Sequence, residues 1–284
     1  MMHSLRGITR LGALISCTLL PGGCSSGNPE VAFRGRAPAD AMPTSIPVAG
    51  ARLRTGFVGS TQRGTVQLAS FRISRSLITV GEYRSCVTAR ECHHPEISVG
   101  NCGGPPISRH PIEGPTFDRS GAENVPVTCV SPAQAQRFCQ WVGGCLPLAT
   151  EWQLAARGKE PHQFAWGDDA PTCERQGRQA MAGENGAEWC KQPWESLHLV
   201  ETGNHPAGAS PVGLQDVLTT TAELVWGART SQTVGCLGDG ACYVISRSAG
   251  SIDGVRGVPA TFDKDTAPAV RAAGFRCVWE DKSP

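Results

Sequence analysis

Residues 145–158, CLPLATEWQLAARG, hold the clearest helix signals in the sequence. Thr150 and Gln153 have the spacing of a capping box, in which two residues satisfy the free backbone N–H groups at the start of a helix. Trp152 and the two alanines one turn after it share one helix face, and Gly158 ends the pattern. The stretch predicts a short helix that is capped by Thr150 and buries its tryptophan.

Two further helices are predicted from the same signals. A Thr–Glu capping-box pair opens residues 79–89 (TVGEYRSCVTA), and apolar residues follow at helical spacing. A Ser–Gln pair opens residues 131–142 (SPAQAQRFCQWV), with proline at the first helical position and two glycines after the end. Each of these stretches therefore predicts an amphipathic helix with one buried face.

The remaining sequence indicates short strands and long irregular stretches. Strand signals occur at residues 66–73 (VQLASFRI), 242–246 (CYVIS) and 274–278 (GFRCV). Residues 158–211 have little periodicity, and the chain contains 34 glycines and 21 prolines. This mixture predicts an α+β fold that is rich in loops and has few, short helices.

The N-terminus is typical of an export signal. Arg6 and Arg10 precede the apolar run 11–20 (LGALISCTLL), which is too short to span a bilayer, since a span needs about 20 apolar residues. Small residues then precede Cys24, as at the cleavage site of a bacterial lipoprotein. We therefore predict a lipoprotein signal peptide over residues 1–24.

Two alternatives to this signal stay open. Pro21 departs from the usual lipoprotein pattern, whereas the residues before Cys17 (LIS) fit that pattern better but leave a shorter apolar core. An ordinary secreted protein with conventional cleavage is the other alternative. Lipidation at Cys24 is the preferred prediction, and it places the protein in the bacterial cell envelope, on the outer membrane, facing the periplasm or the surface.

Beyond the signal, composition predicts a tether and then one domain. Residues 25–50 are rich in Ser, Pro, Ala and Gly without any period, which is typical of a flexible tether. Residues 51–281 are long enough for one large domain. Without residues 1–24 the chain carries 24 basic and 25 acidic residues. This balance argues against a nucleic-acid partner. We also predict that the protein contacts the membrane only through its lipid anchor.

Cysteine usage points to an oxidising compartment. The chain has 13 cysteines, and eleven remain beyond residue 24, which in an exported protein indicates disulfides. An odd number predicts one unpaired thiol. The sequence contains no CxxC pair, which disfavours a thiolate zinc site.

Seven short stretches follow one another in a characteristic order. They are residues 57–59 (FVG), 71–83 (FRISRSLITVGEY), 126–141 (PVTCVSPAQAQRFCQW), 145–158, 165–167 (AWG), 211–216 (PVGLQD) and 274–278. In these stretches the chain resembles the formylglycine-generating enzyme family, also called the sulfatase-modifying factor domain. The resemblance implies a single domain with a loop-rich variant of the C-type lectin fold.

The resemblance also implies an activity whose residues this sequence lacks. In active relatives two cysteine thiolates bind copper and activate oxygen, which converts a sulfatase cysteine to formylglycine. The two matching positions here are Gly254 and Pro259, whose side chains offer no ligand. Of the family's G-N-V-W-E-W only Glu223 remains, and the asparagine that helps to bind calcium becomes Thr220. Copper and calcium are therefore both disfavoured, and no metal ligand or catalytic residue is predicted.

The resemblance implies the disulfide Cys139–Cys277. Local spacing favours Cys86–Cys92 and Cys236–Cys242, and the cysteines that remain pair in order as Cys102–Cys129 and Cys173–Cys190. Cys145 is then the predicted free thiol, and we expect it to be buried and inert.

Three other groups of residues have a structural and a functional interpretation. His93 and His94 beside Cys92 suggest a metal site, but loop histidines next to a disulfide are the preferred interpretation. Ser251 and Asp253 lack the nucleophile-elbow pattern of a hydrolase. The tryptophans lie at family core positions, which favours packing over a sugar-binding platform; they are Trp141, Trp152 and Trp166.

Two functions follow as hypotheses. The preferred one is a non-catalytic domain, a binding or structural module that presents an irregular surface over residues 228–270 to an envelope protein or a glycan. The alternative is an oxidase of the formylglycine-generating type, or other metal-dependent chemistry, with a diverged active site.

Overall fold

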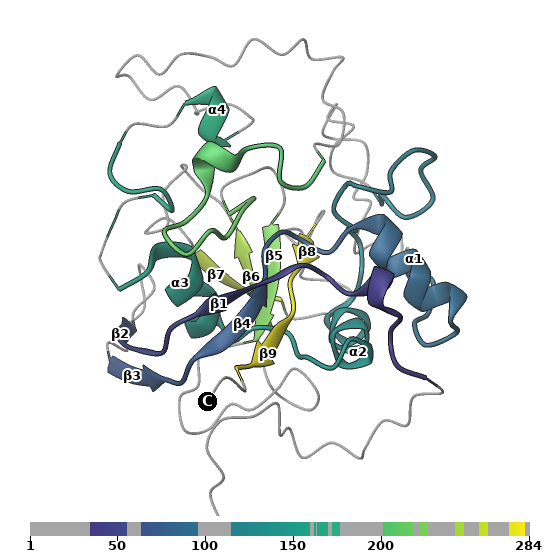
Figure 1. Ribbon diagram of the computed structural model, residues 1–284, viewed down its shortest axis with the longest axis horizontal. Helices are drawn as coiled ribbons and strands as arrows, with labels where there is room; N and C mark the ends of the chain where they lie inside the picture. Colours follow the sequence, from purple (N-terminus) through teal and green to yellow (C-terminus); the bar gives the residue numbers. More distant parts are fainter. Residues whose placement is uncertain are drawn as a thin grey trace, which may run out of the picture.

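The computed structural model describes the chain in the ranges 35–55, 64–95, 115–159, 162, 164–169, 172–176, 201–217, 222–226, 242–246, 256–260 and 273–281. Within these ranges four strands follow a short 3-10 helix, then come the other helices, and then five more strands (Figure 1). In chain order they are η1 Ala39–Ala41, β1 Ser45–Val48, β2 Ala51–Thr55, β3 Gly64–Leu68, β4 Phe71–Ser74, α1 Val80–Thr88, α2 Pro132–Trp141, α3 Ala149–Arg157, α4 Cys173–Gln176, η3 Pro206–Gly208, β5 Ala222–Trp226, β6 Cys242–Ser246, β7 Arg256–Ala260, β8 Ala273–Phe275 and β9 Val278–Glu280.

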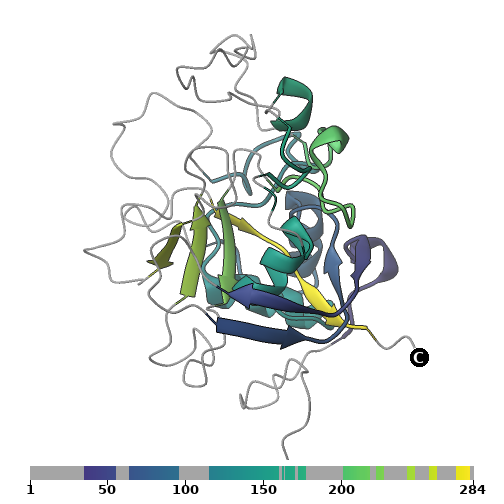
Figure 2. The same ribbon diagram turned by 90° about the vertical axis from the view of Figure 1, so that its left-hand side faces the viewer.

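The strands form three small sheets. β1, β4 and β9 make an antiparallel sheet in that order, in which Ile73 of β4 pairs with Ile46 on one side and Val278 on the other. β2 and β3 form a separate antiparallel pair. The third sheet has the order β7-β6-β5-β8, with β8 parallel to β5. Figure 2 shows β5, β6 and β7 side by side as one layer. The predicted α+β, loop-rich fold class is confirmed.

Two hydrophobic clusters make up the core, and they meet along β5. One gathers the buried faces of α1 and α2 with Phe275, and the other gathers α3 with β1 to β4. Successive side chains of a strand point to opposite faces, so Leu224 enters the first cluster and Val225 the second. Figure 1 shows α1 and α2 on one side of the β1-β4-β9 sheet and α3 on the other. β5 therefore lies between the two clusters and contributes a side chain to each.

The first two predicted capping boxes are confirmed. At α1 the Thr79 hydroxyl accepts from the Glu82 N–H at 3.2 Å, and the Glu82 carboxylate accepts from the Thr79 N–H at 2.8 Å. Ser131 and Gln134 repeat this arrangement at α2. Burial raises the pKa of the Glu82 carboxyl, and its hydrogen bonds to Thr79 oppose that rise. Local sequence alone specifies both helix starts.

The predicted start of the third helix is wrong by two residues, because the sequence placed the N-cap at Thr150. The N-cap of α3 is Leu148, whose side chain has no polar atom, and the Glu151 carboxylate accepts the Leu148 N–H at 2.7 Å. Thr150 instead lies in the first turn, 2% exposed, and within the described residues its hydroxyl has no hydrogen-bond partner. Packing of α3 against the core thus overrides the local Thr150–Gln153 signal.

The domain also begins earlier than predicted. Residues 45–48 lie in the segment predicted as a tether, but they form β1, in which Ile46 and Val48 are 6% and 2% exposed. Only alternate positions of this short strand are apolar enough to be buried, and Pro47 interrupts the pattern, so its sequence has a weak strand signal. Residues 45–48 of the predicted tether therefore belong to the folded domain and pair with β4.

Two predicted strands are each split in two. Residues 66–73 supply β3 and β4, which belong to different sheets, and the chain turns between them beside Gly50. A Cβ at Gly50 would lie 2.7 Å from the Leu68 carbonyl oxygen, so the close approach requires glycine. Residues 274–278 likewise supply β8 and β9, with Arg276 and Cys277 between them.

Among the described residues, no helix is both long and apolar enough to cross a membrane. The predicted signal peptide, residues 1–24, lies outside the described residues.

Candidate functional site

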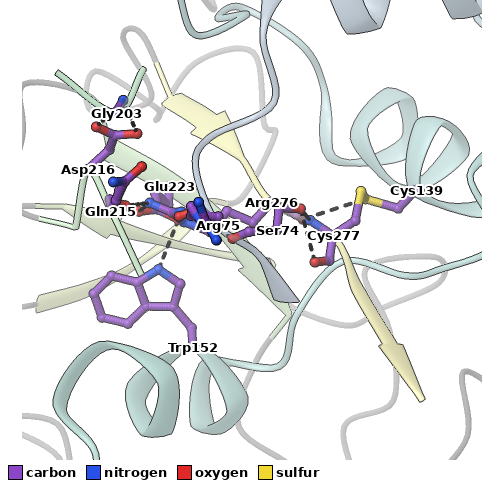
Figure 3. Close-up of polar contacts among 10 residues, drawn as sticks. All are labelled: Ser74, Arg75, Cys139, Trp152, Gly203, Gln215, Asp216, Glu223, Arg276 and Cys277. Atoms are coloured by element: carbon purple, nitrogen blue, oxygen red, sulfur yellow. Dashed lines mark hydrogen bonds and ion pairs between the residues drawn. A yellow bond between two sulfur atoms is a disulfide. The ribbon is translucent and has the colours of Figure 1, made fainter. Parts of the chain in front are cut away.

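A buried ion pair joins the ends of β5 and β8. The Arg276 Nε donates to Glu223 Oε2 at 2.8 Å and its Nη2 donates to Oε1 at 3.2 Å, while the two side chains are 0% and 3% exposed. The Trp152 Nε1–H of α3 donates to the same Oε2 at 2.9 Å (Figure 3). The two carboxylate oxygens therefore accept three hydrogen bonds without contact to solvent.

The remaining donors of Arg276 fix the neighbouring loops. Nη1 donates to the carbonyl oxygens of Ser74 and Arg75 at 3.3 and 2.8 Å, and Nη2 also donates to the carbonyl oxygen of Gln215. A guanidinium has five N–H donors, and all five are used here. A buried charge is tolerated when it is paired and fully hydrogen-bonded, which is the case for this arginine.

The Gln215–Asp216 turn continues the network. Asp216 has a φ of 59°, is 4% exposed, and accepts the Gly203 N–H with its two oxygens at 2.9 and 3.0 Å. The Gln215 N–H donates to the Arg75 carbonyl at 2.8 Å. Gly203 has a φ of 78°, and a Cβ there would lie 2.9 Å from Gln215 Oε1. The loop 201–217 is thus held against the end of β4 by its own polar groups.

The Cys139–Cys277 disulfide lies next to the ion pair. It joins α2 to the residue after Arg276 with a Cα–Cα distance of 5.3 Å, as the family resemblance implied. Ser74 forms hydrogen bonds with both backbone polar groups of Cys277. Its Oγ accepts the Cys277 N–H at 2.9 Å, and its N–H donates to the Cys277 carbonyl at 2.9 Å. Two consecutive residues therefore anchor the chain where it leaves β8, one through charge and one through a covalent bond (Figure 3).

This network has a structural role and not a catalytic one. Arg276 and Glu223 are inaccessible to solvent, and the guanidinium has no donor left for a ligand. Its effect is to fix β5 against β8, and so to hold the four-stranded sheet on the core. The pair thus supports the sheet that includes Pro259 of β7, one of the two positions that the family resemblance matches to the catalytic cysteines.

One of the two positions matched to the family's cysteines lies in this sheet. Pro259 lies in β7, where its backbone is in register with Tyr243 of β6. Gly254 lies outside the described residues, as do Thr220, Ser251 and Asp253, so the sequence predictions made for them are not placed. Within the described ranges, no group of three or more His, Cys, Asp or Glu residues is arranged to hold a metal ion.

The structure tests part of the predicted cysteine pairing. The short disulfide Cys86–Cys92 is present, with a Cα–Cα distance of 5.2 Å. Cys145 was predicted to be a free thiol, and this is wrong, because it is disulfide-bonded, as is Cys129. The sequence assigned Cys145 only by elimination, and chain order does not determine which distant cysteines meet. Predicted pairs that include residues 102, 190 or 236 lie outside the described residues.

The histidines and tryptophans that the sequence singled out all lie within the described residues. His94 hydrogen-bonds to Asp118 and to the Pro95 carbonyl, and the His93 carbonyl accepts from the Tyr83 hydroxyl, so both belong to loop contacts. Trp141 and Trp152 are 3% and 2% exposed and pack in the two core clusters. The ring of Trp166 stacks on Phe164 with centroids 5.1 Å apart. The core position predicted for Trp141 and Trp152 is thus confirmed, and Trp166 is partly buried against Phe164.

Sequence reasoning did not identify the Glu223–Arg276 pair. A signal was present, because Glu223 is the one residue that remains of a diverged six-residue motif and Arg276 lies within the closing G-F-R-C match. A charged residue that remains where its neighbours have changed indicates a partner elsewhere in the chain. Pairing the two would have required the sheet order, which the sequence did not provide.

The architecture and its buried network define a class of protein: a loop-rich α+β domain of the formylglycine-generating type. A family model of the sulfatase-modifying factor enzyme 1-like domain matches residues 33–281. The chain belongs to this family. The model starts ahead of the predicted domain boundary, in agreement with the position of β1.

Individual relatives match over shorter segments. The formylglycine-generating enzyme of Streptomyces coelicolor is 41% identical over 58 residues, which are 20% of this chain and 18% of that protein. The hercynine oxygenase of Mycolicibacterium thermoresistibile is 32% identical over 98 residues, 33% of this chain and 19% of that protein. The matched segments thus span less than a fifth of either relative.

A solved structure shows the likeness of fold over most of the chain. CarF superposes with a TM-score of 0.54 at 17% identity, and the match covers 85% of this chain and 99% of that one. At this identity the likeness concerns the fold and not the activity.

Proposed function

We propose that this protein is a non-catalytic member of its family, a binding or structural module of the bacterial cell envelope. The observation that supports the proposal is the identity of the residues at the two positions of the family's copper-binding cysteines, which are Gly254 and Pro259. Pro259 lies inside the regular pairing of β7 with β6, where the backbone is committed to a sheet.

Copper does not fit this pair of positions. Cu(I) selects soft sulfur ligands, and glycine and proline have no ligand atom in their side chains. The described cysteines with assigned bonding are also committed, since Cys139 and Cys277 form one disulfide and Cys145 is disulfide-bonded. A disulfide sulfur is not the thiolate that would bind the metal. No step through copper is therefore assigned to this chain.

The module would act through the surface at the four-stranded sheet. β5 and β8 are joined by the Glu223–Arg276 pair and by their parallel pairing, which makes this sheet a fixed scaffold. Binding residues are often carried by loops on such a scaffold. The proposed ligand, an envelope protein or a glycan, would contact residues 228–270, which include β6 and β7.

The second candidate is a metal-dependent oxidase or oxygenase. The observation that favours it is the similarity to two proteins named as enzymes, a formylglycine-generating enzyme and a hercynine oxygenase. The two names differ, so the similarity does not assign one activity to this chain. On this hypothesis the chain would use ligands other than the two missing cysteines.

Metal content separates the two candidates. Purified protein that is loaded with Cu(I) or Fe(II) and then desalted is expected to retain far less than a stoichiometric amount of either metal, measured by mass spectrometry of the metal. The double variant Gly254→Cys/Pro259→Cys is the matched control, because it restores the thiolates and is expected to gain copper. Stoichiometric copper or iron in the unchanged protein would contradict the non-catalytic function and support the second candidate.

We also propose that Cys24 is lipidated and anchors the protein in the outer membrane. The expected result is that the full chain partitions into the detergent phase and that Cys24→Ser moves it to the aqueous phase, because about 0.8 kcal/mol of transfer free energy is lost for each buried CH₂ of the acyl chains. Cys17→Ser is the matched control and is expected to change nothing. If Cys17→Ser alone releases the protein, the lipidated residue is Cys17.

A further inference from the structure

The imidazole ring of His94 lies between two oxygen acceptors. Its Nε2 is 2.9 Å from Asp118 Oδ1, and its Nδ1 is 3.1 Å from the carbonyl oxygen of Pro95. A neutral imidazole has one N–H and one lone pair, so it can satisfy only one of two acceptors. The imidazolium has two N–H groups and satisfies both. The geometry therefore favours the protonated ring.

The backbone on the His94 side is fixed by two helices. The Gln134 side chain of α2 donates to the His94 carbonyl at 2.9 Å, and the Tyr83 hydroxyl of α1 donates to the His93 carbonyl at 3.1 Å. Neither bond changes when the ring loses a proton. These two bonds anchor segment 91–95 whatever the charge of the ring, and the ring adds a contact that does depend on its charge.

The backbone on the Asp118 side is fixed by Arg84. Its guanidinium donates to the Phe117 carbonyl through Nε at 3.1 Å and to the Arg119 carbonyl through Nη2 at 2.9 Å. The His94 ring also packs edge-on against the Phe117 ring, with centroids 4.5 Å apart. The ring therefore bridges two segments, 91–95 and 115–119, that are each held independently.

The charged groups around the ring determine the sign of its response to pH. The hydrogen bond to Asp118 is the main cause that raises the pKa of His94, the bond to the Pro95 carbonyl adds to it, and burial opposes it. On the facing elements, α1 presents Arg84, which is paired with Glu123 at 2.8 Å, and α2 presents Arg137, which is paired with Glu91 at 3.0 Å. Arg119 follows Asp118 in the loop, and His93 precedes the ring.

We propose that His94 and Asp118 form a pH-dependent clasp between segments 91–95 and 115–119. The clasp is closed by the imidazolium, which donates from both nitrogens, and it is weakened by the neutral ring, which must release one acceptor. This inference is independent of whether the protein binds a ligand or catalyses a reaction.

The direction of the effect follows from the pKa of the folded state, which is raised. The clasp contributes its full stability below the unfolded histidine value, about 6.5, and loses that contribution as the pH rises through the higher folded value. Both side chains are more than half exposed, at 53% and 58%, so the effect is local and not global.

Hydrogen–deuterium exchange of the purified full chain tests the clasp. After correction for intrinsic rates, Asp118→Asn is expected to raise exchange in peptides covering 91–95 and 115–119 by about 1.4- to 5-fold below pH 6.5, the range for exposed ion pairs, and to have little effect at pH 8.5. His94→Gln is expected to give the same pattern. Both residues are exposed, so these variants are expected to fold.

Asp168→Asn is the matched control, because Asp168 accepts from a different surface histidine, His162, at 3.2 Å. This variant is expected to leave exchange in the two segments unchanged at every pH. If Asp118→Asn raises exchange equally at low and high pH, or at neither, the clasp does not depend on protonation of His94 and the proposal is wrong.

Discussion

Arg276→Met is expected to lower the free energy of unfolding by about 3–5 kcal/mol, the cost of removing one partner from a buried ion pair. The reason is that Glu223 stays buried, at 2% exposure, with its charge no longer compensated. Three carbonyl oxygens, of Ser74, Arg75 and Gln215, lose their donor at the same time. Urea denaturation without a reducing agent measures the change.

Two controls separate the buried charge from other causes. The double variant Arg276→Met/Glu223→Gln removes both charges but keeps an acceptor for the Trp152 Nε1–H, so it is expected to recover part of the loss. Asp169→Asn breaks a surface ion pair with Arg175, in which Asp169 is 76% exposed, and is expected to cost at most about 1 kcal/mol. If Arg276→Met costs no more than this surface variant, the network does not hold the sheet.

Removal of the Cys139–Cys277 disulfide by a double substitution to alanine is expected to lower the free energy of unfolding by about 5 kcal/mol in the chain-entropy model. The bond closes a loop with a sequence separation of 138, so its loss gives the unfolded chain much more freedom. The measurement is again equilibrium denaturation, compared with the unchanged protein under the same conditions.

The Cys86–Cys92 disulfide is the matched control. It is also buried, but its sequence separation is 6, and the same model gives about 2–2.5 kcal/mol for the corresponding double alanine variant. Equal losses for the two pairs would show that burial of sulfur and local strain determine the effect, and that loop length does not.

The helices show how far local sequence could predict this fold. α1 and α2 start at the predicted residues because their capping boxes are complete within four residues, and no distant group is needed. α3 starts two residues early, since burial of Ala149 and Trp152 in the core outweighs the weaker cap at Thr150. A helix end is predictable when its polar groups are satisfied locally, and uncertain when tertiary packing decides.

The strands and the candidate site depended on contacts that the sequence does not show. Residues 274–278 have the pattern of one strand. In the structure Arg276 forms the ion pair and Cys277 forms the disulfide, and at these two residues the chain passes from one sheet to another. Likewise β1 is a strand only because β4 pairs with it, which a Pro-containing segment of four residues does not reveal.

The sequence by itself determined the family, the two capped helices and the residues Gly254 and Pro259 at the copper-ligand positions, because these are properties of residue identity and short spacing. Only the tertiary structure decided that Glu223 meets Arg276, that Cys145 is bonded and that residues 45–48 belong to the domain. Each of these joins positions far apart in the chain, and its stability comes from burial, which exists only once the core has formed.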